Sequence, residues 1–528
     1  MKLLIGIFLL LPLYQCLLVE QYNFTVHTRV SRSVANMDEL LELEEGLALN
    51  LEKYAEALMQ KANTIKRGVQ LMAQRHNEKN TAWDYLKTYS VLRHMQADWL
   101  RWQLFIEKPV ASEYVDYIKS MKPYFPQSWD FEDASEGLKR MQRVYKLKAM
   151  DISAGLLDGV KYNSTFSYLD SIAMAHHLMN QSLWVDAKQW TLAATEMFEF
   201  IEKLPELELI RGFDVEKLYI SLACSLLQQN ETKHALEIYR NAIEHHPPNA
   251  EIFKNYQELE NQMLSKPEPL NNDSKLSLKE EREDPNMPGC CNGRCEVPKN
   301  FSLYCVYNTK TSPFLRLAPI KTELLSKDPY IVIFHDVVSQ KELTRIRTMS
   351  KKHLIASTVI NYTTNAYSVD SYRTSKSVWA PSNHSLTERI TNLVGDATGL
   401  EMATSEMYQV INYGIGGLFE PHVDPVFTDA DRFNGTDDRF ATTIFWLSDV
   451  KQGGATIFTK LNLTVYPQSG SALFWYNLDN WGNEDKRTEH AGCPVIVGSK
   501  WIMTKWVTDM GQEFRQPCYK SKISPLPF

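Results

Sequence analysis

The stretch Tyr413-Gly-Ile-Gly-Gly-Leu-Phe-Glu-Pro-His-Val-Asp424 decides how this sequence is interpreted, because it ends in a His-x-Asp pair. Side chains alternate between the two faces of a strand, so on a strand His422 and Asp424 share one face and can bind the same metal ion. The pair alone is a weak signal, because about one such match is expected by chance among thirteen histidines. The signal becomes stronger because His490 follows a glycine-containing turn and Lys500 lies ten residues later.

His490 would complete a set of metal ligands with two histidines and one carboxylate. Such a facial set leaves three adjacent coordination positions open, which is the arrangement of non-haem Fe(II) oxygenases. Lys500 can supply a fixed cation for the distal carboxylate of a dicarboxylic cosubstrate, since lysine acts as a point charge. The pattern therefore predicts iron-dependent oxidation, whereas a purely structural jelly roll would not need Lys500 at this spacing.

The sequence around this stretch predicts a β domain. Short runs rich in β-branched and aromatic residues are separated by Gly, Pro, Asn or Asp, as in strands joined by turns. These runs cover residues 330–334, 442–447, 455–458, 471–475 and 501–507. Helices are expected at residues 340–354 and 385–398. Many short strands with turns indicate a jelly roll or barrel.

The N-terminal half has a helical pattern instead. Between about residues 35 and 145, apolar residues recur at steps of three and four, namely Leu40, Leu43, Leu47, Leu51, Tyr54 and Leu58. The stripe fits either a coiled-coil seam or one face of a bundle helix. Further along, the spacing of Ala175, Ala187 and Ala194 is repeated forty-eight residues later by Ala223, Ala235 and Ala242.

Small residues at these offsets predict tetratricopeptide-like helical hairpins, in which two helices approach closely. Such hairpins form a concave surface that suits an extended peptide. Most aromatic residues of this region are expected in its core, but a few, with Trp184 and Tyr219 as candidates, could line a groove for a polyproline-II ligand.

The start of the chain predicts the secretory pathway. Lys2 precedes an apolar run over residues 3–13 that is too short to span a bilayer, so residues 1–19 are interpreted as a cleaved signal peptide. No later stretch is long and apolar enough to span. Ten Asn-x-Ser/Thr sequons agree with a glycoprotein. A net charge of −7 without a strong basic patch argues against nucleic acid as a main partner.

Seven cysteines remain after the signal peptide. A polar, proline-rich linker contains a cluster made of Cys290, Cys291, Cys295 and Cys305, while Cys493 and Cys518 bracket the C-terminal end. In an oxidising lumen these residues are candidate disulfide partners. A zinc site is the weaker alternative, because no histidine lies nearby at ligand spacing. Cys224 falls within a helical pattern and is expected to be a buried thiol.

The motifs resemble a known family. Residues 413–424, 439–458, 474–477 and 490–518 are similar to the catalytic domain of animal prolyl 4-hydroxylase α subunits, and Ser128-Trp129 and Tyr145-Lys-Leu147 resemble its N-terminal region. The resemblance implies an α+β multidomain chain that ends in a double-stranded β-helix (jelly-roll) oxygenase domain. The expected parts are a signal peptide (1–19), a helical dimerisation domain (20–149), a tetratricopeptide-like peptide-binding domain (150–262), a linker with the cysteine cluster (263–327) and a catalytic domain (328–528).

The resemblance also implies roles for single residues. His422, Asp424 and His490 match the ligands of Fe(2+), and Lys500 matches the residue that pairs with the C5 carboxylate of 2-oxoglutarate. Further matches are Tyr413 and Thr456 near that cosubstrate, Arg439 and Trp506 near the peptide, a disulfide between Cys493 and Cys518, and a second one between Cys305 and Cys290 or Cys291. The implied reaction is hydroxylation of proline at C4 with dioxygen and 2-oxoglutarate, which gives succinate and carbon dioxide, with L-ascorbate as a further cofactor.

Two positions depart from the family pattern. Phe419 stands where the family usually has Tyr before Glu-Pro-His, and Thr508 stands where it usually has His. The changes remove a phenol near the peptide site and an imidazole near 2-oxoglutarate. They leave two alternatives open: a catalytically weak α-subunit-like protein that binds peptides, and an oxygenase that acts on a different substrate.

The family resemblance also implies a partner. The sequence given ends Ser-Pro-Leu-Pro-Phe528, without a Lys-Asp-Glu-Leu-type retrieval signal, so retention in the endoplasmic reticulum lumen is expected to depend on a partner. The family pairs its α subunit with protein disulfide isomerase as β subunit in an α2β2 tetramer. The stripe from Leu40 to Leu58 is the expected α–α contact. The expected substrate is a proline-rich or collagen-like polypeptide of the secretory pathway.

Overall fold

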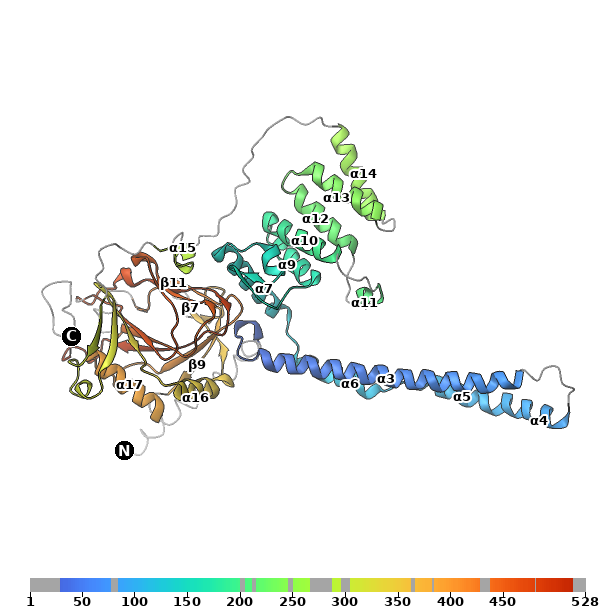
Figure 1. Cartoon of the computed structure of the whole chain (residues 1–528), viewed down its shortest axis with the longest axis horizontal. Helices are drawn as coiled ribbons and strands as arrows, with labels where there is room; N and C mark the ends of the chain where they lie inside the picture. The colour runs from blue at the N-terminus through green and yellow to red at the C-terminus, as the bar shows by residue number, and fades with distance from the viewer. Residues whose placement is uncertain are drawn as a thin grey trace. The chain divides into compact units, whose positions relative to one another are not determined.

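The computed structural model describes residues 29–76, 84–199, 205–210, 215–245, 250–265, 287–295, 304–361, 366–381, 384–427, 437–479 and 481–515 (Figure 1). The predicted signal peptide, most of the linker and Cys518 lie outside these ranges. The chain divides into two compact units, Asn36–Gln127 and the remainder, which comprises Met1–Ala35 with Ser128–Phe528. Among the described helices, none is both long and apolar enough to cross a membrane.

The smaller unit is entirely helical in its described part. Its elements are α3 (Met37–His76), α4 (Tyr85–Arg93), the π-helical turn η2 (His94–Asp98), α5 (Trp99–Glu107), α6 (Ser112–Met121) and the short η3 (Lys122–Tyr124). The predicted stripe lies along α3, where Leu40, Leu43, Leu47 and Tyr54 are half-buried but Leu51 and Leu58 are exposed. Within this unit, the other described helices therefore cover only part of the apolar face of α3.

The larger unit begins with more helices. They are α7 (Ser128–Tyr145), α8 (Ala149–Ser153), a small hairpin of β1 (Leu156–Leu157) and β2 (Val160–Lys161), α9 (Tyr168–Asn180), α10 (Trp184–Glu199), α11 (Pro205–Ile210), α12 (Val215–Leu227), α13 (Thr232–His245) and α14 (Ala250–Ser265). The six repeated alanines are buried, as close helix pairing requires. Helix α7, which the expected boundaries place in the dimerisation domain, belongs to this larger unit.

The C-terminal region is a two-sheet structure, which confirms the predicted fold class. A nine-stranded sheet has the order β3-β4-β5-β16-β12-β19-β10-β9-β6, and a four-stranded sheet has the order β11-β17-β14-β15. The bounds are β3 (Cys305–Asn308), β4 (Ile320–Lys327), β5 (Tyr330–His335), β6 (Ile355–Ala356), β9 (Ser375–Ala380), β10 (Tyr408–Tyr413), β11 (Phe419–His422), β12 (Arg439–Trp446), β14 (Thr456–Phe458), β15 (Leu463–Val465), β16 (Ala472–Tyr476), β17 (His490–Gly492) and β19 (Trp501–Thr508). Peripheral elements are η1 (Val30–Arg32), α15 (Met287–Cys291), η4 (Phe314–Arg316), β7 (Val359–Asn361), β8 (Ala366–Ser368), β13 (Gln452–Gly453), η5 (Thr459–Leu461), η6 (Lys486–Thr488) and β18 (Val495–Val497).

Alternation of side chains divides the core into two layers. Val332 and Phe334 pack with the residues of α16 (Gln340–Lys351) and α17 (Ser385–Thr398) on one face of the large sheet. Their neighbours Ile331 and Ile333 pack on the other face, together with Phe458 of the small sheet. Both faces of the central strands are therefore buried, which explains why their sequences are continuously apolar.

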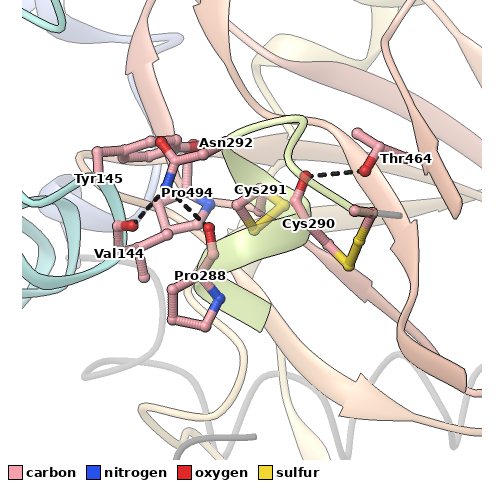
Figure 2. Close-up of a disulfide and its surroundings, with 10 residues drawn as sticks. Val144, Tyr145, Pro288, Cys290, Cys291, Asn292, Thr464 and Pro494 are labelled. Carbon is pink, nitrogen blue, oxygen red and sulfur yellow. Dashed lines mark hydrogen bonds between the residues drawn. A yellow bond between two sulfur atoms is a disulfide. The ribbon is translucent and has the colours of Figure 1, made fainter. Parts of the chain in front are cut away.

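The cysteines pair differently from the prediction. Cys493 bonds to Cys291, with a Cα–Cα distance of 5.6 Å, and Cys290 bonds to Cys295 (Figure 2). The expected Cys493–Cys518 disulfide is therefore wrong, and so is the pairing of Cys305, which is free and exposed. The reason is α15, which packs against α7, β14 and β15 and so brings Cys291 to the end of β17. Cys224 is an exposed free thiol, not a buried one.

Candidate metal and cosubstrate site

The candidate site lies on the small sheet, where strand register places its residues in two adjacent rows. In the first row His422 of β11 pairs with His490 of β17, which pairs with Phe458 of β14. In the second row Gly492 of β17 pairs with Thr456 of β14. The rows are two residues apart along β17, about 6.6 Å on an extended strand, and therefore face the same side.

The first row supplies a set of metal ligands. One ligand atom from each of His422, Asp424 and His490 lies within 4.8 Å of the others, a spacing at which the three could hold one ion. Asp424 Oδ1 is 3.9 Å from His422 Nε2, and its Oδ2 is 3.8 Å from His490 Nε2. Two imidazoles and one carboxylate are donors that suit Fe(II).

Hydrogen bonds to the backbone orient both imidazoles. His422 Nδ1 lies 2.7 Å from Glu420 O, and His490 Nδ1 lies 3.0 Å from Thr488 O. A carbonyl oxygen can only accept, so Nδ1 carries the proton and Nε2 is left for the metal. Burial, followed by the neighbouring His490, lowers the pKa of His422 to about 3, which keeps this ligand neutral.

Polar neighbours hold the carboxylate ligand. Thr442 Oγ1 donates to Asp424 Oδ2 at 2.5 Å, and Asn477 Nδ2 donates to Thr442 Oγ1 at 2.8 Å. Burial acts to raise the pKa of Asp424, but the histidines, Arg439 and the Thr442 hydrogen bond lower it overall, so the carboxylate stays ionised. Thr442 and Asn477 were not singled out from the sequence, because only the pairing of β12 with β16 brings them beside Asp424.

Of the predicted cosubstrate residues, Thr456 belongs to the second row, while Tyr413 at the end of β10 and Lys500 just before β19 approach Gly492 in the same row. A Cβ built on Gly492 would lie 3.5 Å from Lys500 Nζ and 3.6 Å from Tyr413 Oη, so both polar groups converge on the space that glycine leaves open. Thr456 is the strand partner of Gly492. The Lys500 ammonium is 4.8 Å from the Tyr413 ring centroid, and no salt bridge to it is found among the described residues.

The environment of Lys500 favours an anionic ligand. The side chain is 2% exposed, and burial lowers its pKa to about 7. A buried ammonium without a counter-ion is costly, and a carboxylate bound beside it would remove that cost. A buried cation beside Gly492, one row from the metal ligands, therefore suits one carboxylate of a dicarboxylate whose other end binds the metal.

Arg439 and Trp506 lie together at the rim of the same site. The Arg439 guanidinium stacks 3.8 Å from the Trp506 ring centroid and binds Glu406 at 2.6 Å, and Arg439 Nη1 lies 3.4 Å from Asp424 O. Trp379, which is partly exposed, packs beside Trp506 at 6.0 Å between centroids. The two predicted peptide residues are thus adjacent to the metal ligands, with Glu406 as a contact that the sequence alone did not indicate.

Phe419 and Thr508, the two departures from the family pattern, both contact neighbouring side chains. The Phe419 ring stacks on His422, with 3.6 Å between centroids, and meets Tyr372 edge-on at 5.7 Å. Thr508 Oγ1 lies 2.9 Å from Thr404 Oγ1 and 3.2 Å from Thr404 O, so its hydroxyl is engaged locally. Phe419 therefore shields a metal ligand, whereas Thr508 turns to a neighbouring loop.

Trp184 and Tyr219, the other predicted peptide contacts, lie on different elements from the metal site. Trp184 begins α10 and Tyr219 lies on α12, and both are partly buried. Tyr219 packs against the core formed by α12, α13 and α14. Their contact with a peptide stays a prediction.

Comparison with known families defines the class of protein. Residues 408–508, which contain the metal and cosubstrate rows, match the 2OG-Fe(II) oxygenase superfamily. The chain is therefore an Fe(II)- and 2-oxoglutarate-dependent dioxygenase. The donor set around His490 and the buried cation Lys500 fit these two groups.

Residues 33–159 match the family "Prolyl 4-Hydroxylase alpha-subunit, N-terminal region". The chain is 31% identical to prolyl 4-hydroxylase subunit alpha-1 of Caenorhabditis elegans, over 92% of this chain and 90% of that protein. It is 30% identical to subunit alpha-1 of Bos taurus and 28% identical to that of Homo sapiens, in each case over 94% of this chain and 97% of the relative. The chain belongs to the prolyl 4-hydroxylase α-subunit family.

Proposed function

We propose that this chain hydroxylates proline at C4 in polypeptides of the secretory pathway, using dioxygen and 2-oxoglutarate and releasing succinate and carbon dioxide. The observation that carries the proposal is the pair of adjacent rows on the small sheet. Three ligand atoms within 4.8 Å of one another lie one row away from a buried lysine that forms no salt bridge within the described part of the chain. This is the geometry needed for a dicarboxylate that binds a metal at one end and a cation at the other.

The residues of the site take distinct roles in this proposal. His422, Asp424 and His490 hold Fe(II), and Lys500 pairs with the distal carboxylate of 2-oxoglutarate, beside Tyr413 and Thr456. When bound, iron and 2-oxoglutarate together supply the oxidising power that inserts oxygen into an unactivated C–H bond. The protein keeps the His422 imidazole neutral, orients the carboxylate through Thr442 and excludes water by burial.

The peptide is proposed to reach the iron past Arg439 and Trp506. The partly exposed Arg439 guanidinium covers the buried Trp506 ring beside Asp424, and Trp379 next to Trp506 is exposed; exposed aromatic rings are suited to polyproline-II segments. Trp184 and Tyr219 are proposed to contact more distant parts of the same chain on the helical repeat. L-Ascorbate is proposed to restore iron that is oxidised during unproductive cycles.

We also propose that the chain functions with protein disulfide isomerase as β subunit in an α2β2 tetramer in the lumen of the endoplasmic reticulum. Its membership of the family supports this assembly, and the exposed Leu51 and Leu58 on α3 support an α–α contact in the smaller unit. Co-expression of the full chain with and without the isomerase, followed by size-exclusion chromatography with light scattering, tests the proposal. A soluble, active monomer without the isomerase would contradict it.

Turnover of 2-oxoglutarate with and without a proline-rich peptide tests the catalytic proposal. The purified assembly should release succinate faster when the peptide is present, and an Asp424→Ala assembly should not respond. The peptide in which every proline is replaced by alanine is the matched substrate control. Equal stimulation by both peptides would contradict a reaction on proline.

A catalytically weak, peptide-binding role is the second candidate, favoured by Phe419 and Thr508. In that case the assembly would bind the proline-rich peptide, but the peptide would not accelerate the release of succinate. The same experiment, with peptide binding measured in parallel, therefore separates the two candidates.

A further inference from the structure

A segment far from the catalytic strands in sequence packs behind the cosubstrate site. Residues 29–35, here called the clamp segment, lie together with α7 against residues 414–417, here called the glycine loop. The glycine loop joins β10, which ends at Tyr413, to β11, which ends at His422. It therefore connects a predicted cosubstrate residue to a predicted metal ligand.

The side chain of Asn412, which is fully buried, links the clamp segment to the backbone of the site. Its Nδ2 donates to Lys500 O at 3.1 Å, and Tyr413 N donates to the same oxygen at 3.2 Å. On its other side, Oδ1 accepts hydrogen bonds from three groups of the clamp segment: Ser33 Oγ at 2.6 Å, Val34 N at 3.1 Å and Ala35 N at 3.2 Å.

Arg32, in the middle of the clamp segment, attaches the segment to neighbouring elements. Its guanidinium, only 3% exposed, forms a two-pronged ion pair with Asp133 of α7 at 2.8 and 3.1 Å. Arg32 Nη1 also donates to the carbonyl oxygens of Asp370 and Arg373, at 2.7 and 3.1 Å. The Arg373 guanidinium in turn lies 4.9 Å from the centroid of Phe419, the ring that stacks on His422.

Backbone-to-backbone packing makes the contact between α7 and the glycine loop tight. A Cβ on Gly137 of α7 would lie 2.1 Å from Ile415 O, and a Cβ on Gly416 would lie 2.1 Å from Gly137 O. A Cβ on Gly414 would lie 2.1 Å from Ser31 O in the clamp segment. The groups that would clash are backbone atoms, so the loop itself would have to move.

These contacts give the clamp segment a function in catalysis. A loop with three glycines among four residues is flexible by itself, and ordering it costs conformational entropy. We propose that the clamp segment and α7 are positioning elements of the 2-oxoglutarate site: through Arg32, Asn412 and Gly137 they hold the glycine loop and so place Tyr413 and Lys500 for the cosubstrate. The inference concerns 2-oxoglutarate binding, and it stands whether or not proline is the residue that is oxidised.

Two measurements on the full chain, purified as its assembly, test this inference. The first is hydrogen–deuterium exchange of residues 412–418 in metal-free protein, which needs no turnover. The second is the dissociation constant of 2-oxoglutarate for Fe(II)-loaded protein without oxygen, by calorimetry. The variants are Arg32→Ala, the conservative Arg32→Lys and Gly137→Ala. The matched control is Gly395→Ala, a helical glycine on α17 whose added Cβ first meets the flexible Met402 side chain at 3.2 Å.

We expect Arg32→Ala to speed exchange at residues 412–418 and to weaken 2-oxoglutarate binding about tenfold, equivalent to about 1.4 kcal/mol. Arg32→Lys should lie between this variant and the unchanged chain, since it keeps the charge but not the two-pronged geometry. Gly137→Ala should act in the same direction although alanine favours the helix, and Gly395→Ala should change neither quantity.

A folded Arg32→Ala or Gly137→Ala protein with unchanged exchange and unchanged 2-oxoglutarate affinity would overturn the inference. So would a lower melting temperature in these variants without any shift in affinity, because that result would indicate a purely structural role. If Arg32→Ala does not fold, Gly137→Ala decides. Failure of the unchanged assembly to hydroxylate proline would count against the proposed function but not against this inference.

Discussion

The metal ligands and the two positions that depart from the family pattern are held differently. At the metal end, strand pairing places His422 opposite His490, and backbone carbonyls hold both rings. At the two positions that depart from the family pattern, Phe419 and Thr508, the strand pairing is irregular: β11 shifts register between Phe419 and His422, and β12 shifts register next to Arg439, the partner of Thr508. The three ligands and their hydrogen bonds are all present, whereas Phe419 stacks on His422 and Thr508 binds Thr404, so we expect the metal to be bound as in the family and the use of peptide and 2-oxoglutarate to be altered.

The largest expected effect is at the metal end. His422→Ala, Asp424→Ala and His490→Ala should each abolish turnover, since two ligands do not hold labile Fe(II) in a productive geometry. Asp424→Glu should also fail, because the added methylene moves the carboxylate. Thr442→Ala, which keeps all three ligands, should lower turnover by only about 10- to 100-fold. Succinate release and iron content check these results, and substantial turnover by any alanine variant would remove that residue from the ligand set.

Lys500→Ala should mainly raise the KM for 2-oxoglutarate, by about 10- to 100-fold, because a charge-assisted hydrogen bond is lost. Lys500→Arg should restore only part of the affinity, since the guanidinium is larger and planar. Initial rates at varied 2-oxoglutarate, with the peptide held at saturation, measure the effect. An unchanged KM in Lys500→Ala would show that the cosubstrate binds elsewhere.

The affinity for 2-oxoglutarate should depend on pH. Burial lowers the pKa of Lys500 to about 7, so the free site loses its positive charge as the pH rises through this value. A bound carboxylate raises the pKa again, so binding above pH 7 takes up a proton and weakens by up to about tenfold per pH unit. Calorimetry between pH 6 and 9 measures this slope.

Lys500→Arg is the control for the pH experiment, because arginine stays charged and should not show the same slope. The stability of the ligand-free protein should change in the opposite sense. Between about pH 7 and 10 the unfolded state keeps the lysine proton that the folded state has lost, so the contribution of Lys500 to stability rises with pH. If the unchanged chain and Lys500→Arg showed the same dependence of 2-oxoglutarate affinity on pH, the titrating group would not be Lys500.

The smallest expected effects are at the two positions that depart from the family pattern. Thr508→His should tighten the use of 2-oxoglutarate, or reduce its decarboxylation without peptide oxidation, by a few-fold, because it restores the family's imidazole. Phe419→Tyr is the matched comparison, since it adds a phenol on the peptide side and should change the peptide KM more than the cosubstrate KM. If Thr508→His changes neither quantity, the contacts of Thr508 with Thr404 have no bearing on the cosubstrate.

The sequence predicted the parts of the site that local rules determine. The His-x-Asp spacing correctly predicted that His422 and Asp424 lie together, although β11 ends at His422 and Asp424 follows in a bend, not on the strand. The positions of His490 and Lys500 further along the sequence indicated the rest. The sequence alone could not predict three further contacts of the site, because they form only through the pairing and packing of distant strands. These contacts are made by Thr442, Asn477 and Glu406. The predicted disulfide pairing was wrong for a similar reason. The position of α15 beside β17, and not the spacing of cysteines in the sequence, brings Cys291 to Cys493.

Helix α7 shows the same limit at the level of domains. Its sequence indicates a helix but not a partner, and the expected boundary at residue 149 grouped it with the dimerisation helices. In the structure Gly137 lies against the glycine loop and Tyr145 donates to Pro494 O at 2.6 Å (Figure 2). A glycine that permits close approach has no signature in a single sequence, so this contact could only be found in three dimensions.

Mass spectrometry of the peptide product tests whether this chain hydroxylates proline at C4. A proline-rich peptide is incubated with the purified assembly, Fe(II), 2-oxoglutarate and ascorbate, and fragmentation together with chromatography against 3- and 4-hydroxyproline standards locates the added oxygen. We predict that one oxygen atom is added at C4 of proline, that 2-oxoglutarate is required, and that the Asp424→Ala assembly adds none. Consumption of 2-oxoglutarate with no oxygen on proline, or oxygen on another residue, would contradict hydroxylation of proline by this chain.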